Sequence, residues 1–125
     1  LFSEFSHLQY TALQGSTDAR LAGIASKSLM EVAYHRRWSG EWVVRLGDGT
    51  EESHGRMKAA LATLWTHAWE LFACAPFETS VAEQGIGVDP STLQTEWLHR
   101  VGEVLTEAGL ASALTASIGL APDDT

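Results

Sequence analysis

The chain has 125 residues, of which 45% are hydrophobic and 19% are charged. This size and composition are typical of one globular domain and exclude a disordered or low-complexity chain. Eight Lys and Arg side chains stand against sixteen Asp and Glu, for a net charge of −8, so the sequence predicts no nucleic-acid partner. Cys74 is the single cysteine, and no apolar run approaches the roughly 20 residues that cross a bilayer. We therefore expect a cytoplasmic protein without a membrane segment.

The first half of the chain predicts two helices. Apolar residues recur at helical spacing before Gly15, and the chain begins inside this pattern without Met, which suggests a piece of a longer protein. Ser16, Thr17 and Asp18 offer caps for a second helix of about 29 residues, roughly 43 Å long. The residues expected to face inward on this second helix are Leu21, Ile24, Ser28, Val32, His35, Ser39, Trp42 and Leu46. Such a length favours long antiparallel helices.

The second half predicts two more helices. A third helix follows the stop and cap signals of segment 47–50 and is expected to end at Ala75, before a proline. Its expected inward face consists of Met57, Leu61, Leu64, Ala68, Leu71 and Phe72. Segment 74–88 is predicted to be a loop, with a short turn of helix as an alternative. A fourth helix opens at Asp89, faces inward through Leu93, Trp97, Val101, Val104 and Ala108, and ends at Gly109.

The sequence contains no sustained alternation of apolar and polar residues that would indicate a strand. We therefore predict an all-α fold. Its organisation is expected to be a helical bundle segment over residues 1–110, followed by an irregular tail over residues 111–125.

The motif Glu-x-x-His, which di-iron carboxylate bundles use for metal binding, occurs three times. The matches are Glu4/His7, Glu51/His54 and Glu96/His99. At about 100° per residue, the first and third pairs fall on the sides of their helices away from the apolar stripe, and the second pair lies at a helix start. We interpret all three as solvated or inter-subunit surface rather than as metal ligands.

Glu31 and His35 differ from these matches because both fall on or beside the expected inward stripe of the second helix. An inward carboxylate and imidazole must be paired or ligated, since burial of an isolated charge costs several kcal/mol. Their spacing is not that of Glu-x-x-His. We therefore predict a buried polar pair, satisfied within the helix or by an Arg from a neighbouring helix, rather than a metal site.

Tryptophan and arginine are concentrated on the same helix. Arg36, Arg37, Trp38 and Arg45 combine residue types that are enriched in protein interfaces. We take these four residues as interface candidates, with ordinary solvated surface as the alternative. No nucleophile elbow, phosphate-binding loop or dinucleotide-binding glycine pattern is present.

Four segments in this order and spacing resemble a known family. They are 31–39 (EVAYHRRWS), 45–51 (RLGDGTE), 64–72 (LWTHAWELF) and 83–90 (EQGIGVDP). Over roughly residues 1–110 the chain is similar to the C subunits of bacterial phenylacetyl-CoA epoxidases, the monooxygenases of phenylacetate degradation. The resemblance implies a partial ferritin-like antiparallel bundle. It also implies that the first helices of the family precede Leu1, so that this chain is a fragment.

The resemblance further implies a function. The C subunit is expected to be structural and to pair with the homologous catalytic A subunit, which holds the di-iron centre, and with further epoxidase subunits. We expect no cofactor in this chain itself. Two alternatives are a catalytic di-iron oxygenase subunit, which needs about four carboxylates and two histidines that converge, and a helical interaction module outside aromatic catabolism. A homodimer is a further alternative for the assembly.

Overall fold

The computed structural model describes residues 1–112, all of whose regular elements are helices. The five α-helices are α1 (Phe2–Leu13), α2 (Ala19–Gly47), α3 (Glu51–Ala68), α4 (Pro76–Glu83) and α5 (Gln94–Glu107). Two short 3₁₀ helices, η1 (Trp69–Phe72) and η2 (Pro90–Leu93), flank the α4 region. The all-α prediction is confirmed for this part of the chain, whereas residues 113–125 of the predicted tail lie outside the described residues.

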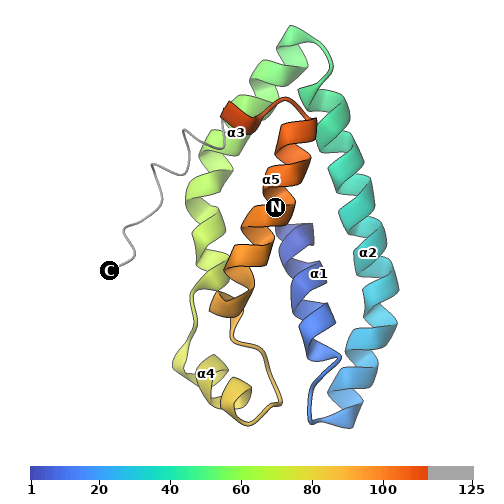
Figure 1. The fold of residues 1–125 in the computed structure, drawn as a ribbon, viewed down its shortest axis with the longest axis vertical. Coiled ribbons are helices and arrows are strands. Elements are labelled where there is room, and N and C mark those ends of the chain that lie inside the picture. The colour runs from blue at the N-terminus through green and yellow to red at the C-terminus, as the bar shows by residue number, and fades with distance from the viewer. Residues whose placement is uncertain (113–125) are drawn as a thin grey trace.

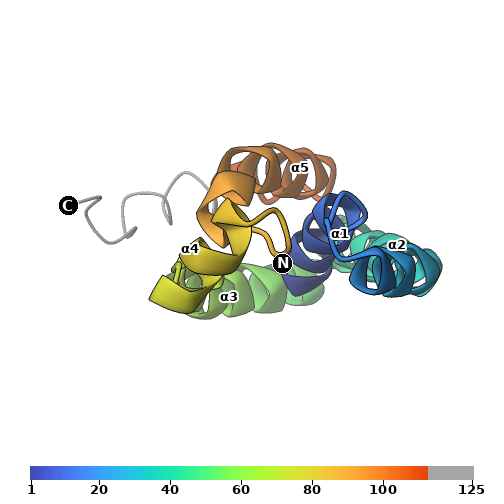
Figure 2. The ribbon, with the colours of Figure 1, turned by 90° about the horizontal axis from the view of Figure 1, so that it is seen from below.

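The two longest helices run antiparallel and are joined by a short turn. Figure 1 shows α2 and α3 as the long sides of a wedge that meet at its top, with α1 between them and α5 in front, and Figure 2 shows α5 on one side of these helices. The Asp18 carboxylate accepts hydrogen bonds from the backbone N–H groups of Arg20 and Leu21, and the Thr50 hydroxyl accepts one from Ser53. These caps satisfy N–H groups that have no partner within the helix, so both predicted helix starts are confirmed.

The chain departs from the prediction after α3. The α-helix ends at Ala68 rather than at Ala75, and one turn of 3₁₀ helix continues it to Phe72. The predicted loop at 74–88 contains α4. The backbone N–H of Ala75, the residue just before α4, donates a hydrogen bond to the Glu78 carboxylate at 3.2 Å. The following loop is tied to the α1–α2 turn, because the Thr17 N–H donates to the Gly85 carbonyl at 2.8 Å.

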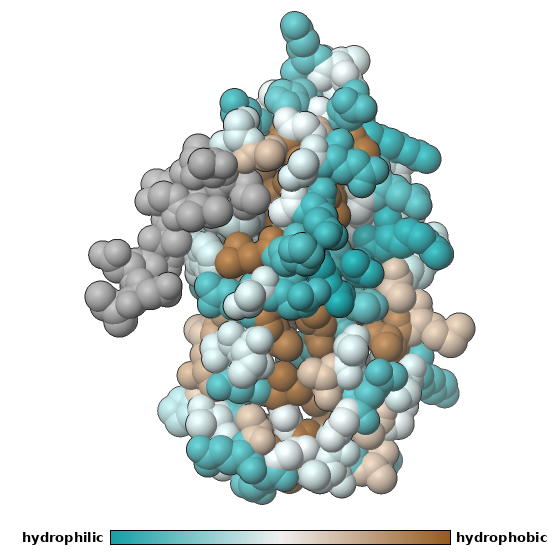
Figure 3. Space-filling model, viewed as in Figure 1, coloured by the Kyte–Doolittle hydropathy of each residue, from teal (hydrophilic) through white to brown (hydrophobic). Residues whose placement is uncertain are grey.

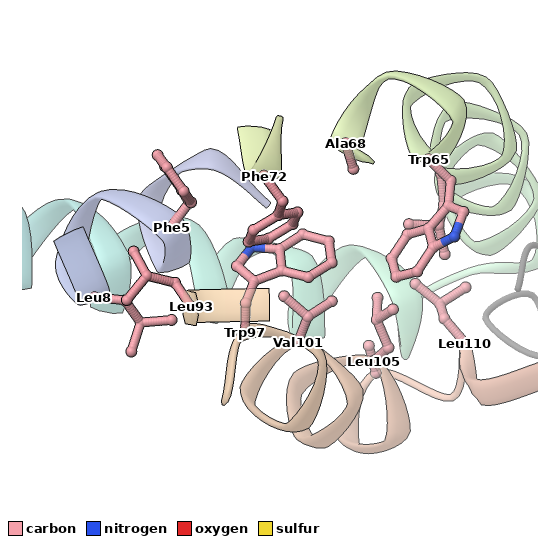
Figure 4. Packing of buried hydrophobic residues seen from close by; sticks show 12 residues of the cluster. Phe5, Leu8, Trp65, Ala68, Phe72, Leu93, Trp97, Val101, Leu105 and Leu110 are labelled. Carbon is pink, nitrogen blue, oxygen red and sulfur yellow. The ribbon is translucent and has the colours of Figure 1, made fainter. Parts of the chain in front are cut away.

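The core lies where α1, α3 and α5 meet. Trp65 and Trp97 have no exposed surface, and their rings lie 5.4 Å apart between centroids. Figure 4 shows Trp97 between Phe72 and Val101 in the middle of this cluster. The Trp97 indole N–H donates to the Leu1 carbonyl at 3.0 Å, which joins α5 to the start of α1. Trp65, and not the predicted Leu64, is the inward residue of α3 at this level, because Leu64 is exposed.

The most deeply buried positions of α2 are small residues, and Val43 and Val44 pack beside them against the core. Ala25 and Gly47 are the buried positions of α2. A Cβ atom added at Gly47 would lie 2.6 Å from the Ala108 carbonyl oxygen, so the close approach between the end of α2 and the end of α5 requires glycine there. Figure 2 shows α1 against α2, with α5 and α3 on opposite sides of the start of the chain.

The observed inward face of α2 lies about a quarter turn around the helix from the predicted inward stripe. Ile24, Trp42 and Leu46, all expected to face inward, are exposed. The helix carries two apolar faces, and the face with small side chains packs on the bundle because it allows the helix axes to approach closely. The aromatic face is left on the outside.

Candidate functional site

The most distinctive surface of the described chain is the exposed side of α2. We define the outward face of α2 by nine exposed residues, Met30, Glu31, Tyr34, His35, Trp38, Glu41, Trp42, Arg45 and Leu46. Trp38 is 54% exposed and Trp42 is 42% exposed, and their rings lie 6.3 Å apart between centroids. Contiguous exposed aromatic surface of this kind is uncommon on a monomer and typical of an interaction site.

The outward face also carries cations that rest on aromatic rings. The Arg45 guanidinium lies 5.3 Å from the centre of the Trp42 ring, and the neighbouring Arg37 guanidinium lies 5.9 Å from the centre of the Tyr34 ring. Five of the chain's eight Lys and Arg residues belong to α2, which contains two carboxylates, Glu31 and Glu41. This helix is therefore cationic by three charges (five minus two) in a chain of net charge −8.

The prediction that Glu31 and His35 form a buried polar pair is wrong. Both side chains are exposed, and they lie on the outward face of α2 beside Trp38. The error follows from the misassigned stripe, because the same quarter turn that exposes Trp42 also exposes these two residues. Without burial, neither side chain bears the desolvation cost that motivated the pairing.

A buried polar pair does exist, but between α1 and α2. The Glu4 carboxylate accepts a hydrogen bond from the Arg36 Nε–H at 2.8 Å. Glu4 is 9% exposed, so the expectation that it lies on a solvated surface is wrong, while Arg36 is half-buried. Because Arg36 is held by Glu4, it is not part of the outward face. Of the other interface candidates, Trp38 and Arg45 belong to this face and Arg37 borders it, and all three are exposed.

His7 extends this polar contact toward α5. Arg100 Nη1 lies 3.1 Å from His7 Nδ1, and the Arg100 Nε–H donates to the Glu96 carboxylate at 3.0 Å. Since a guanidinium only donates hydrogen bonds, Nδ1 must accept, and the ring proton lies on Nε2. Burial, followed by the positive charges of Arg36 and Arg100, lowers the pKa of His7 below its usual value of 6.5. The two Glu-x-x-His pairs at 4/7 and 96/99 thus contribute to structural ion pairs.

The remaining histidines of these motifs are also engaged locally. His54 Nδ1 lies 2.8 Å from the Gly47 carbonyl oxygen, which fixes the turn between α2 and α3. His99 Nε2 lies 3.1 Å from the Glu103 carboxylate on the surface of α5. Within residues 1–112, no three His, Cys, Asp or Glu side chains converge in a way that would hold a metal ion. The donor set of the described residues therefore does not fit a di-iron centre.

Two hollows lie beside the Glu4–Arg36 pair. A mostly apolar hollow of about 170 Å³ lies between the start of α1 and helices α2, α3 and α5. It is smaller than the roughly 300–1,000 Å³ of a typical small-molecule site. A larger and more open groove of about 600 Å³ lies between α2 and α5. Its walls carry three arginines and three glutamates, namely Arg36, Arg37, Arg45, Glu4, Glu41 and Glu107. Its charges balance, so it offers no concentrated positive field for a phosphate group.

Other exposed large apolar side chains, Phe2, Leu64 and Phe77, belong to three different helices, α1, α3 and α4. On the side of the molecule seen in Figure 3, apolar side chains surface mainly between the helices in the lower half, and polar side chains cover the upper half over α5 and α2. Among the described residues, no helix combines the length and the apolarity that a membrane crossing requires. The outward face of α2 is therefore the candidate functional surface.

Comparison with known proteins identifies the family. The model of a family described as "Phenylacetic acid catabolic protein" matches residues 1–116. The chain belongs to the phenylacetic acid catabolic protein family. Within this family it is 40% identical, over 101 residues, to the C subunit of the 1,2-phenylacetyl-CoA epoxidase of Escherichia coli (strain K12). The match covers 81% of this chain and 41% of the relative, so the chain spans about two fifths of the relative's length. The resemblance predicted from the four sequence segments is confirmed.

Proposed function

We propose that this chain is part of a non-catalytic, structural C-type subunit of a phenylacetyl-CoA epoxidase, with a ferritin-like bundle. The 40% identity to the C subunit of the E. coli epoxidase is the observation that carries the proposal. The side chains at Glu4, His7 and His54 support it, because each is committed to a structural hydrogen bond or ion pair inside the bundle. In this proposal the di-iron chemistry belongs to a partner subunit, and the protein acts in the cytoplasm.

The partner in this proposal is the homologous catalytic oxygenase subunit, together with further epoxidase subunits. The outward face of α2 and the bordering Arg37 form the surface proposed for this contact, with Trp38, Arg37 and Arg45 as anchors. Exposed aromatic rings and arginines are the residue types that dominate binding energy at protein interfaces. All three side chains are exposed in the described part of the chain.

A pull-down from cells grown on phenylacetate tests the proposal. The tagged chain is expected to retain the catalytic subunit, and the double variant Trp38→Ser with Arg37→Glu is expected to lose it. The variant Lys58→Glu, an exposed position on α3, is the control for the change of charge. Recovery of no epoxidase subunit by a folded chain would contradict the partner assignment.

One observation favours the alternative of a catalytic di-iron subunit. Glu31 and His35, a carboxylate and an imidazole one turn apart, are both exposed on the outward face of α2. Ligands from another segment or subunit would be able to complete a site on this face. Iron analysis of the purified complex, with Glu31→Gln and His35→Leu variants, separates the two functions. Near-stoichiometric iron that depends on these two residues would replace the structural proposal.

A further inference from the structure

The imidazole of His7 on α1 is held between cations that come from two other helices. Its Nδ1 lies 3.1 Å from Arg100 Nη1 of α5, and the positive charge of Arg36 of α2 also acts on the ring. The Arg100 Nε–H donates at 3.0 Å to the Glu96 carboxylate, so this guanidinium contacts a carboxylate and the imidazole at the same time. Because Nδ1 serves as the acceptor, the neutral ring is the form that this arrangement binds.

One negative charge acts on the same ring from within α1. Glu4 lies one helical turn before His7, and its charge favours the protonated imidazole, against the two arginines. The charges that face His7 are therefore Arg36 of α2, Arg100 of α5 and Glu4 of α1 itself. The short helix η2 also packs on α1, and it contains no titratable side chain. Although Glu4 already accepts a hydrogen bond from Arg36, a carboxylate has two oxygens and accepts from a second donor as well.

We propose that His7 is a pH-dependent latch between α1 and α5, which holds Arg100 when the ring is neutral and turns to Glu4 when the ring is protonated. A proton on Nδ1 removes the lone pair that accepts the Arg100 N–H and places two positively charged groups with nitrogen atoms 3.1 Å apart. Their repulsion separates the two side chains. Arg100 keeps its bond to Glu96, so α5 retains its own ion pair and loses one contact with α1.

An NMR titration of the full chain from about pH 8 to about pH 5.5 tests the latch without any variant. The ring nitrogens of His7 report its protonation, and the guanidinium nitrogens of Arg100 report the loss of the contact. We expect His7 to carry its proton on Nε2 at the upper end and both residues to change with one common midpoint below 6.5. A midpoint at or above 6.5, or Arg100 resonances that ignore the protonation of His7, would overturn the proposal.

Variants of the surrounding charges test which groups set this midpoint. Arg100→Gln removes the neighbouring cation and is expected to raise the midpoint of His7, whereas Glu4→Gln removes the attracting carboxylate and is expected to lower it. Arg37→Gln, at an exposed position of α2, is the control and is expected to leave the midpoint unchanged. A midpoint that does not respond to Arg100→Gln, or that responds equally to the control, would contradict the latch.

A double-mutant cycle gives a second readout, which a merely structural contact would not produce. The coupling between His7 and Arg100, measured by urea denaturation with His7→Leu and Arg100→Gln, is expected to be stabilising at about pH 8 and to vanish or change sign at about pH 5.5. His99 and Glu103, 3.1 Å apart on the surface of α5, are the matched control. Their coupling is expected to grow over the same range, because a protonated His99 attracts the carboxylate. A His7–Arg100 coupling that stays constant or grows like the control as the pH falls would overturn the proposal, and the titration decides it if a variant does not fold.

Discussion

Two tryptophan pairs with the same spacing lie in opposite environments. One pair is Trp65 and Trp69, and the other pair is Trp38 and Trp42. Within each pair the two residues are four positions apart and their rings are in contact. Trp65 is fully buried against Trp97 of α5, whereas Trp38 and Trp42 lie on the outward face of α2. The difference shows that helical spacing identifies an apolar face without deciding whether the molecule covers it. Whether an apolar face is buried depends on whether a neighbouring helix can pack against it.

The largest contrast is expected from truncating a tryptophan in each region. Trp97→Ala removes a ring that contacts Trp65, Trp69 and Phe72 and also removes the hydrogen bond to the Leu1 carbonyl. We expect a loss of about 3–5 kcal/mol in the free energy of unfolding, measured by urea denaturation. Trp42→Ala is expected to change it by about 0.5 kcal/mol or less at low protein concentration. Equal losses would contradict the assignment of the two regions.

The small-residue face of α2 allows a second comparison within one helix. Gly47→Ala introduces a methyl group 2.6 Å from the Ala108 carbonyl oxygen and 2.9 Å from the Ala108 Cβ. Since backbone must move to accommodate it, we expect destabilisation of about 1–3 kcal/mol. Gly23→Ala meets no atom within 4 Å and is expected to stabilise α2 by about 0.5–1 kcal/mol. Thermal unfolding of both variants measures whether Gly47→Ala lowers the melting temperature and Gly23→Ala raises it.

Two glutamates provide a third comparison, between a buried and an exposed carboxylate. Glu4→Gln weakens the bond to Arg36 and leaves a half-buried guanidinium without its counter-charge. We expect a loss of about 1–3 kcal/mol in the free energy of unfolding, smaller than for a fully buried pair because Arg36 retains contact with water. Glu31→Gln on the outward face is expected to be nearly neutral. A larger loss at Glu31 than at Glu4 would contradict this comparison.

The smallest effect on stability is expected from a change of pH, through the protonation of His7. Because burial and the charges of Arg36 and Arg100 lower the pKa of His7 in the folded state, the unfolded chain binds the proton more tightly. Stability is therefore unaffected by this group above about pH 7. It decreases as the pH falls through the unfolded value of 6.5 toward the lower folded value. We expect His7→Asn to flatten this part of the profile of melting temperature against pH.

The sequence predicted helices α1, α2, α3 and α5 and the family, but not α4, which lies in the predicted loop at 74–88. Caps at Asp18, Thr50 and Asp89 all form as predicted, because a cap is a local interaction between a side chain and the next few backbone N–H groups. Gly109 ends the last predicted helix with φ at +74°, a conformation that glycine adopts without steric cost. The four sequence segments likewise led to the family that the comparisons establish.

Tertiary structure alone decided which residues face the core and which form the candidate site. α2 has an aromatic face and a small-residue face, and its sequence periodicity favoured the aromatic one. The bundle instead buries Ala25 and Gly47 most deeply, with Val43 and Val44 beside them, and the end of α5 at Ala108 approaches α2 closely because Gly47 has no side chain. That choice exposes Glu31, His35 and Trp38 together. It also brings Glu4 of α1 to Arg36, a contact between residues 32 positions apart that no local pattern encodes.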